Sequence, residues 1–264
     1  MKKIDYHIHS TNSFDGKSTI LEMCKASIDN KIDEICFTEH FSIDKDIPTY
    51  GFLDFNKYSR EIDDARNIFH GRLKIHKGLE ICEPYFNKEI LKETIKDQNL
   101  DFILGSVHNM KKTKLRNYIE GKTNKEVYEG YFKEIYQMVL LSDIDAIAHL
   151  DLLKRYAYDS LGNYSFIEHE ELIYDILKLA IKRDIAIEIN TSGLRCNSLE
   201  CFPSVSVIKA YKSLGGELIT IGSDAHNTKY LSYEYFNQIK LLKSLGFKYI
   251  YVYEKRKQKS ISLE

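Results

Sequence analysis

The sequence predicts an α/β fold, and we expect one (β/α) barrel domain spanning residues 1–264. Three observations support this expectation. Short apolar, β-rich runs alternate with longer segments of helical period along the whole chain, which predicts parallel strands joined by crossover helices. The strand candidates are apolar on both faces, as expected for strands buried between helices and a core. Six of the nine histidines fall at the carboxyl end of a predicted strand, where barrel active sites are assembled.

Seven strands are predicted, with an eighth possible. They are Lys3–His9, Glu34–His40, Leu73–Glu80, Asp101–His108, Asp145–His149, Ile185–Asn190 and Leu218–Asp224, and the possible eighth is Lys248–Glu254. Each is a short β-rich run followed by polar residues. Seven or eight such units fit a closed barrel, and a doubly wound sheet is the alternative.

Helices are predicted between these strands from the spacing of apolar residues. They are Thr19–Asn30, Phe55–Phe69, Asn87–Gln98, Asn124–Ser142, His169–Arg183, Val205–Leu214 and Tyr233–Leu245. In His169–Arg183, one inward stripe is formed by Ile173, Ile176, Leu177, Ala180 and Ile181.

Composition narrows the class of protein. Only 3 Pro and 13 Gly occur and no linker-like tract is present, which favours a single domain. The net charge of -1 gives no broad electrostatic footprint for nucleic acid. No apolar run reaches the ~18 residues of a membrane span, and the charged start lacks the apolar segment of a secretory signal. We therefore expect a cytoplasmic protein with neither a nucleic-acid nor a membrane partner; the sequence leaves its oligomeric state open.

The five cysteines are scattered and never form a C-x-x-C pair. This pattern argues against a disulfide framework and against a zinc ribbon. We expect most of them to be reduced, small core residues.

The first predicted strand carries His7-Ile8-His9. Histidines at i and i+2 of an extended segment point to the same side, so both can reach one metal ion, although such a pair also arises by chance. Glu80 and Asp224 end apolar strands, where an ionised carboxylate is costly unless a cation compensates it. Asp15 precedes Gly16 and reads locally as a turn residue; only the histidines make it a ligand candidate.

A single buried histidine is more often structural than a metal ligand. The joint occurrence of these residues at the strand ends of one barrel therefore decides in favour of a metal site. The strand ends together supply about nine nitrogen and oxygen ligands and no thiolate, which exceeds the needs of a mononuclear zinc site and predicts two or three ions. The predicted ligands are His7, His9, Asp15, His40, Glu80, His108, His149, Asp224 and His226. Glu39 and Asp151 could each be either a hydrogen-bonding partner of an imidazole or a surface group, and the sequence does not decide between the two. The remaining histidines, His70, His76 and His169, are expected to be structural or solvated.

The order of these motifs resembles the PHP (polymerase and histidinol phosphatase) superfamily. The matching motifs are His7-Ile8-His9, Thr38-Glu39-His40, Gly78-Leu79-Glu80, Gly105-Ser106-Val107-His108, Ala148-His149 and Ser223-Asp224-Ala225-His226. Further segments are similar to its histidinol-phosphate phosphatase branch, namely His9-Ser10 with Ser13 and Asp15-Gly16, Asp151–Tyr156 and Asn190–Arg195. The resemblance implies a distorted (β/α)7 TIM-like barrel with a trinuclear metal centre, in which Lys248–Glu254 is an extra strand.

Carried over by this resemblance, the first ion would be held by His7, His9, Glu80 and Asp224, the second by Glu80, His108 and His149, and the third by Asp15, His40 and His226. Mixed imidazole and carboxylate ligands suit Zn, Fe or Mn. The implied reaction is hydrolysis of L-histidinol phosphate, in histidine biosynthesis, by a metal-bridging hydroxide. A PHP-type phosphoesterase acting on another small phosphate ester, on phosphotyrosine or on nucleic acid is the alternative.

Catalytic roles are assigned to Glu80, Asp224 and His226, and the group that protonates the leaving alkoxide is left open between His226 and a metal-bound water. Arg195 and Arg155 are the candidate phosphate ligands, because guanidinium grips phosphate oxygens bidentately. Further substrate contacts are suggested for Tyr118, Tyr156, Tyr158 and Glu83. A covalent Ser or Cys nucleophile is disfavoured, since no motif marks Ser10, Ser106 or Ser223 as one.

Overall fold

Seven parallel strands form one sheet whose strand order follows the chain. A computed structural model of the protein describes residues 1–47 and 49–264. The strands of this sheet are β1 (Ile4–Ile8), β2 (Glu34–Phe41), β3 (Lys74–Cys82), β4 (Phe102–Ser106), β7 (Ala146–Ile147), β8 (Ala186–Asn190) and β9 (Ile219–Gly222). All seven were predicted, with ends that differ by at most two residues.

The two edges of the sheet meet and close it into a barrel. The residues just after β9 pair with β1: the backbone N–H of Asp224 donates to the carbonyl of His7 at 2.8 Å, and that of His9 donates to the carbonyl of Ala225 at 2.9 Å. The predicted (β/α)7 barrel is therefore confirmed, and the doubly wound alternative is wrong. Closure brings the first and last motifs of the sequence side by side.

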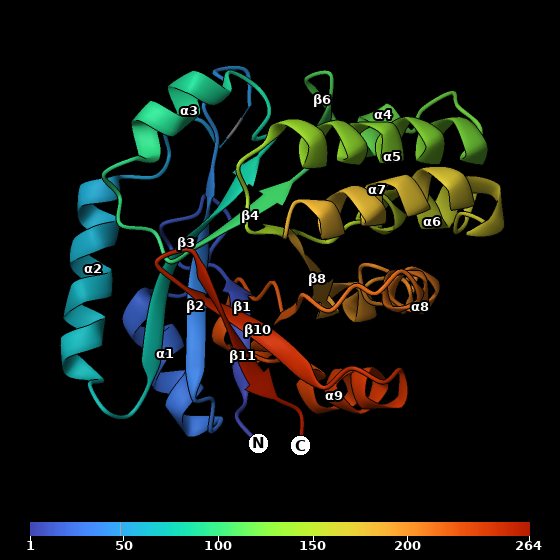
Figure 1. Cartoon of the computed structure of the whole chain (residues 1–264). Helices are drawn as coiled ribbons and strands as arrows, with labels where there is room; N and C mark the ends of the chain where they lie inside the picture. The colour runs from blue at the N-terminus through green and yellow to red at the C-terminus, as the bar shows by residue number, and fades with distance from the viewer. Residues whose placement is uncertain (48) are drawn as a thin grey trace.

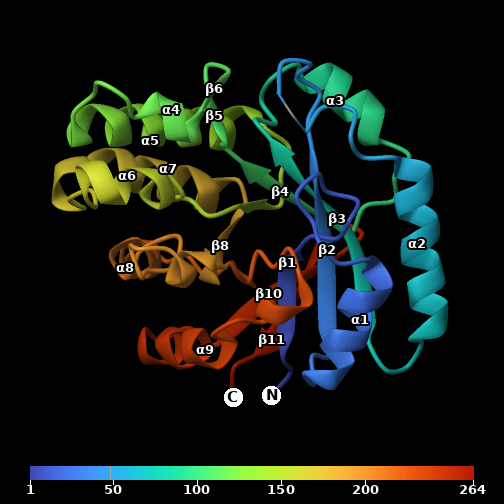
Figure 2. The same cartoon turned by 180° about the vertical axis from the view of Figure 1, so that it is seen from behind.

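Helices surround the barrel (Figures 1 and 2). The longer ones are α1 (Ile20–Asp29), α2 (Phe55–Ile68), α3 (Lys88–Ile95), α5 (Asn124–Leu141), α7 (Glu170–Lys182), α8 (Val205–Ser213) and α9 (Tyr235–Ser244). Local sequence sets their starts: Thr19 begins α1 with a capping box to Glu22, and Thr123 begins α5 with one to Glu126. The predicted stripe on α7 is buried except for Ile181, which is partly buried.

A C-terminal hairpin covers the amino end of the barrel. It consists of β10 (Tyr249–Glu254) and β11 (Lys257–Ser262), paired antiparallel. The Tyr6 hydroxyl donates to the carbonyl of Tyr253 at 2.5 Å and accepts from its N–H at 3.0 Å. The N–H of Lys255 donates to the Asp101 carboxylate at 3.0 Å, just before β4. Lys248–Glu254 is thus an extra strand, as expected, and it leaves the carboxyl end of the barrel open.

Several short elements after the strands escaped prediction. They are β5 (Asn109–Met110), β6 (Thr113–Lys114), α4 (Leu115–Tyr118), α6 (Lys154–Leu161) and the 3-10 turns η1 (Ile167–His169), η2 (Thr191–Arg195) and η3 (Thr228–Tyr230). Apart from α6, which is as long as the predicted α3, these elements are too short to show a helical or strand period. Most of them follow β4, β7, β8 or β9, so they shape the rim of the barrel.

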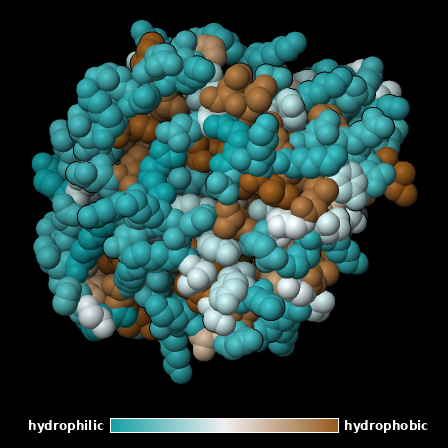
Figure 3. Space-filling model, viewed as in Figure 1, coloured by the Kyte–Doolittle hydropathy of each residue, from teal (hydrophilic) through white to brown (hydrophobic). Residues whose placement is uncertain are grey.

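The apolar side chains of the strands and the inner helix faces form one core. The face shown in Figure 3 is mainly hydrophilic, with hydrophobic patches between the polar side chains. Within the described residues, no helix combines the length and the apolar character needed to cross a membrane. The two termini lie next to each other below the barrel in both cartoon views.

Candidate metal centre

Each of the nine predicted ligands lies at or just beyond a strand end, or, for Asp15, in the loop after β1. They converge at the carboxyl end of the barrel in three clusters, two of which share Glu80. The pairing of neighbouring strands brings these side chains to the same level of the barrel. For example, His40 on β2 is the direct cross-strand partner of Glu80 on β3. All of these positions were named from the sequence alone, and the structure brings them together.

The first cluster joins β1, β3 and the segment after β9. His7 and His9 point to the same side, and their Nε2 atoms lie 3.0 Å apart. Glu80 Oε2 lies 3.2 Å from Nε2 of His7 and 3.4 Å from Nε2 of His9. Asp224 Oδ1 lies 3.8 Å and 3.6 Å from the same two nitrogens. Two imidazole nitrogens and two carboxylate oxygens therefore face one small space.

The second cluster uses the other oxygen of the same carboxylate. Glu80 Oε1 lies 2.8 Å from Nε2 of His149 and 3.2 Å from Nε2 of His108. The two imidazole nitrogens are 3.4 Å apart. Because its two oxygens face different nitrogen pairs, Glu80 is placed to bridge two ions.

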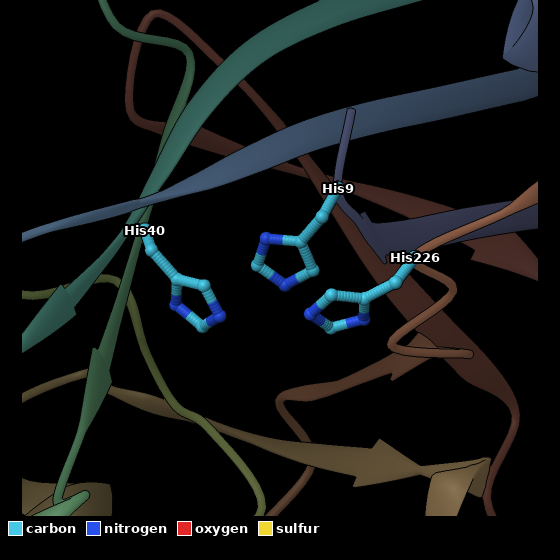
Figure 4. Close-up of side chains that lie close together, drawn as sticks. All are labelled: His9, His40 and His226. Carbon is cyan, nitrogen blue, oxygen red and sulfur yellow. The ribbon is translucent and has the colours of Figure 1, made fainter. Parts of the chain in front are cut away.

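The third cluster lies nearest the rim. Asp15 Oδ1 is 3.6 Å from Nε2 of His40, and its Oδ2 is 3.2 Å from Nε2 of His226. Figure 4 shows the rings of His9, His40 and His226 facing one another from three separate segments. The centroid of the His9 ring lies 4.2 Å from that of His40 and 4.3 Å from that of His226, so the first and third clusters are contiguous.

Buried partners fix the orientation of the first two imidazoles. The Nδ1 of His7 lies 2.6 Å from Glu188 Oε1, which leaves Nε2 facing the first cluster. The Nδ1 of His9 lies 3.1 Å from the Ser13 hydroxyl, which donates to Glu39 at 2.5 Å. Glu39 is thus a buried indirect partner of His9, and the reading of it as a surface group is wrong.

Glu188 was missed by the sequence analysis, although a charged residue within the apolar run Ile187-Glu188-Ile189 was an available signal. Its second oxygen accepts from the backbone N–H of His149 at 2.8 Å, so one carboxylate holds parts of two clusters. Gly222 makes room for this contact: a Cβ there would lie 2.3 Å from the Cβ of His7 and 2.4 Å from Glu188 Oε1.

Two of the predicted ligands have unusual backbone conformations. His149 has a φ of 26° and Asp224 a φ of 55°, in the positive region that residues other than glycine rarely adopt. The strands β7 and β9 end just before them. Strain of this kind persists where the surrounding structure enforces it, and here it accompanies side chains aimed into the clusters.

The electrostatics favour ionised carboxylates at Glu80 and Asp224 and a neutral imidazole at His9. Burial opposes the charge on Glu80, but the imidazoles of His40, His108 and His7 outweigh it and hold the pKa of that carboxyl well below its usual range. Asp224 has a lowered pKa for a similar reason, with burial opposed by His9, His7 and Arg155. Burial, together with the charges of His40 and His226, lowers the pKa of His9 to about 4. His9 is therefore neutral at pH 7, as a ligand must be.

The donor set fits divalent cations. Among residues 1–47 and 49–264, Asp15 Oδ1 and His226 Nε2 are buried atoms that make no hydrogen bond, and both face the third cluster. An unpaired buried polar atom is costly, and a cation would supply the missing partner. His226 uses its other nitrogen, Nδ1, which lies 3.0 Å from the Asp224 carbonyl. Nitrogen and oxygen donors in this ratio suit Zn, Fe or Mn alike.

A cavity of about 390 Å³ opens onto the three clusters. Besides seven of the predicted ligands, it is lined by Phe14, Ile47, Thr49, Cys82, Asn109, Lys114, Leu115, Arg116, Arg155 and Tyr156. Cys82, Lys114 and Arg116 were missed: the cysteine was expected in the core, and no motif marked the two cations.

The two arginines singled out from the sequence are placed differently. Arg155 lines the cavity and its Nη2 donates to Asp224 Oδ2 at 3.1 Å. Arg195 does not line it; its guanidinium donates to the carbonyls of Ser223 at 2.9 Å and Asp224 at 3.2 Å and lies over the Tyr230 ring. Arg195 thus braces the backbone that carries Asp224, and its predicted contact with phosphate remains a prediction.

The other suggested substrate contacts are also placed. Tyr156 lines the cavity, whereas Tyr118 and Tyr158 do not. The Glu83 carboxylate accepts from the backbone N–H groups of His108 at 2.7 Å and Asn109 at 2.8 Å, so it is already engaged. It faces an adjacent cavity of about 250 Å³.

The serine hydroxyls that could have competed as nucleophiles are engaged elsewhere. Ser10 donates to Glu39, Ser106 to the carbonyl of Ile81 and Ser223 to Asp5. This arrangement agrees with the expectation that no serine is the nucleophile.

The remaining residues left open or set aside have structural positions. Asp151 is buried and pairs with Lys154 at 3.0 Å, so the surface alternative is wrong for it too. His70 is exposed. His76 is buried against Glu34, and His169 is buried among aromatic rings, as expected for structural histidines.

The sequence is similar to known proteins along nearly its whole length. Residues 5–192 match the PHP domain model. The probable histidinol-phosphatase of Clostridium acetobutylicum is 31% identical over 258 residues, which cover 97% of this chain and 98% of that protein. The histidinol-phosphatase of Lactococcus lactis is 30% identical over 252 residues, which cover 94% of this chain and 93% of that protein.

The fold is similar to that of a solved enzyme. The crystal structure of histidinol phosphate phosphatase from Lactococcus lactis, complexed with Zn, L-histidinol and phosphate, superposes with a TM-score of 0.89 at 27% identity. The match covers 98% of this chain and 99% of that one.

Proposed function

Because this chain belongs to the PHP domain family, we propose that it is a metal-dependent phosphomonoesterase that hydrolyses L-histidinol phosphate to L-histidinol and phosphate. The observation that carries the proposal is the convergence of nine candidate nitrogen and oxygen ligands, Glu80 among them, in a chain about 30% identical to histidinol-phosphatases over nearly its full length. The sequence similarity extends over the whole barrel and includes the loops that would contact the substrate. A shared fold alone would not identify the substrate.

Three divalent ions would be held by the three clusters. Glu80 would serve two of them through its separate oxygens, and the third would lie between Asp15, His40 and His226. Zinc is favoured by the ion described in the Lactococcus enzyme, and the donor set is compatible with it. When bound, such ions activate a water molecule near neutral pH and neutralise the charge on phosphoryl oxygens.

The chain's own residues would complete the phosphate site. Arg155 brings a guanidinium to the cavity beside Asp224, where it can grip phosphate oxygens. Lys114 and Arg116 add two cations to the lining. These residues orient the phosphate ester and offset its negative charge, and the low pKa of Glu80 and Asp224 keeps both carboxylates ionised opposite them.

The rest of the substrate would occupy the apolar side of the cavity. The exposed Phe14 ring stacks on His40 with a centroid distance of 5.5 Å, and Tyr156 lies under the Arg116 guanidinium. Both rings are placed to pack against a small planar group such as an imidazole. We retain Glu83 as a weaker candidate for the substrate ammonium, since its oxygens already accept backbone hydrogen bonds.

The test is a substrate comparison with the metal-loaded protein. We expect kcat/KM for L-histidinol phosphate to exceed that for an aryl phosphate, phosphotyrosine or single-stranded DNA by about 100-fold or more, since binding of the whole substrate contributes to the transition state. If kcat/KM for any of the other substrates is equal or higher, the assignment of L-histidinol phosphate as the substrate is wrong. If the protein hydrolyses none of these substrates, the phosphoesterase assignment is overturned.

A further inference from the structure

Cys82 is the last residue of β3, two positions after Glu80, so both side chains point to the same face of the strand. Its side chain is almost fully buried, and it lines the cavity over the metal centre. The sulfur lies 3.3 Å from Nδ1 of His108. It also belongs to a group of donor atoms with His40 and His108 that all lie within 4.8 Å of one another. Cys82 is not one of the nine predicted ligands.

The two nitrogens of His108 face opposite directions. Nε2 lies 3.2 Å from Glu80 Oε1 and 3.4 Å from Nε2 of His149, within the second cluster. Nδ1 points away from that cluster and meets the sulfur of Cys82. An imidazole that binds a metal through one nitrogen usually donates its other N–H to a fixed acceptor. The sulfur is placed as that acceptor, just as Glu188 is for His7.

The second observation concerns His40, whose side chain is 8% exposed. Its Nε2 faces Asp15 at 3.6 Å in the third cluster. Its Nδ1 is a buried atom without a hydrogen bond in the described part of the chain, although Glu80 Oε2 lies 3.1 Å away. His40 also offers a ring nitrogen to the same group of donor atoms as the sulfur of Cys82. One thiol therefore lies between imidazoles assigned to two different ions.

We propose that Cys82 is a positioning residue that links the second and third metal sites. Its sulfur accepts the Nδ1–H of His108, which presents Nε2 to the second ion, and it lies beside the ring of His40, whose Nε2 faces the third cluster. The proposal rests on the metal sites of the proposed function but not on the identity of the substrate. Cys82 acts through the imidazoles and does not bind an ion itself, because Nδ1 of His108 lies on the side opposite the second cluster.

Substitution at this position gives the first test. In Cys82→Ala, the affinity for one of the ions should fall by about 10- to 100-fold, as when other partners of ligand imidazoles are removed. Cys82→Ser should recover most of the loss, because a hydroxyl can also accept the N–H. Cys36→Ala is the matched control: Cys36 is equally buried in neighbouring β2 but lies outside the metal-ligand groups of the described residues. It should bind metal as the unaltered protein does.

Metal affinity is measured by competition with a chelator in the absence of substrate, so failure of the proposed substrate would not affect the result. Unchanged affinity in Cys82→Ala would overturn the proposal, and so would an equal loss in Cys36→Ala. Cobalt(II) loading separates positioning from direct ligation. We expect no sulfur-to-cobalt charge-transfer band in the unaltered protein; a band that disappears in Cys82→Ser would show that the sulfur is a ligand and contradict the positioning role.

Discussion

Glu188 Oε1 lies 2.6 Å from Nδ1 of His7, and in its own strand Glu188 stands between the apolar residues Ile187 and Ile189. Both side chains are buried, so the contact fixes which nitrogen of the imidazole faces the metal centre. The same carboxylate holds the backbone of His149 through its other oxygen. Glu188 thereby supports two of the three clusters without being one of the predicted ligands.

Glu188→Gln should therefore weaken metal binding by at least about 10-fold, because the amide removes the charge that orients His7. Chelator competition on the purified variant measures this. Glu34→Gln is the matched control, since Glu34 also holds a buried imidazole, that of His76 at 2.7 Å, at the amino end of the barrel. The prediction fails if the two variants bind metal equally well.

Gly222 should tolerate no side chain. Alanine there would press against His7 and Glu188, and overpacking of this kind costs roughly 1–3 kcal/mol of unfolding free energy. We expect Gly222→Ala to lose metal affinity as well as stability. Gly121 has a φ of 69° and open space around it, so Gly121→Ala should cost about 1 kcal/mol from backbone strain and leave metal binding intact. Denaturant unfolding and metal content of both variants would show whether the two effects separate.

The two arginines should give different kinetic signatures. Arg155→Met should lower kcat/KM on histidinol phosphate by at least about 10-fold and weaken inhibition by inorganic phosphate, because a charged partner of the phosphate is lost. Arg195→Met should chiefly lower thermal stability, since it removes two hydrogen bonds to the backbone around Asp224. If Arg195→Met instead abolishes phosphate inhibition while Arg155→Met does not, the two roles are exchanged.

His76 should make stability depend on pH. Burial alone would lower its pKa, but hydrogen bonds and charge from Asp101 and Glu34 raise it above the ordinary value of 6.5. The folded protein thus holds a proton that the unfolded chain loses first. The stabilisation is fully present below pH ~6.5 and is lost as the pH rises through the raised pKa, with a slope of at most about 1.4 kcal/mol per pH unit.

His76→Asn should flatten that part of the profile, and unfolding free energies measured between pH 6 and pH 9 would test it. An identical slope in the variant would mean that other groups set the dependence.

The sequence predicted the barrel because alternating apolar runs and helical segments extend over the whole chain, and it predicted the convergence of the clusters because parallel strands share one carboxyl end. Helices with capping signals, such as α1 and α5, were placed within one residue at each end. Candidate ligand positions such as Glu80 and Asp224 could be named because a charge at the end of an apolar strand is conspicuous.

What the sequence could not provide depends on contacts between distant residues. Glu188 meets His7 only because β8 and β1 face the same interior, 181 residues apart in sequence. Cys82 looks like any small core residue until the loop after β4 brings His108 beside it. Arg155 and Arg195 both follow strands that end at the candidate metal centre. They differ only in side-chain direction, because Arg155 lines the cavity and Arg195 turns to the backbone of Ser223.

Reconstitution of the metal-free protein tests the central claim most directly. Divalent zinc is added in steps while bound metal per chain and hydrolysis of L-histidinol phosphate are measured together, for the unaltered protein and for Glu80→Gln. We predict no activity without metal, recovery as the chain approaches three bound ions, and fewer ions with no recovery in Glu80→Gln, because that carboxylate faces two clusters. Full activity of the metal-free protein, or three ions and unaltered activity in Glu80→Gln, would contradict the account.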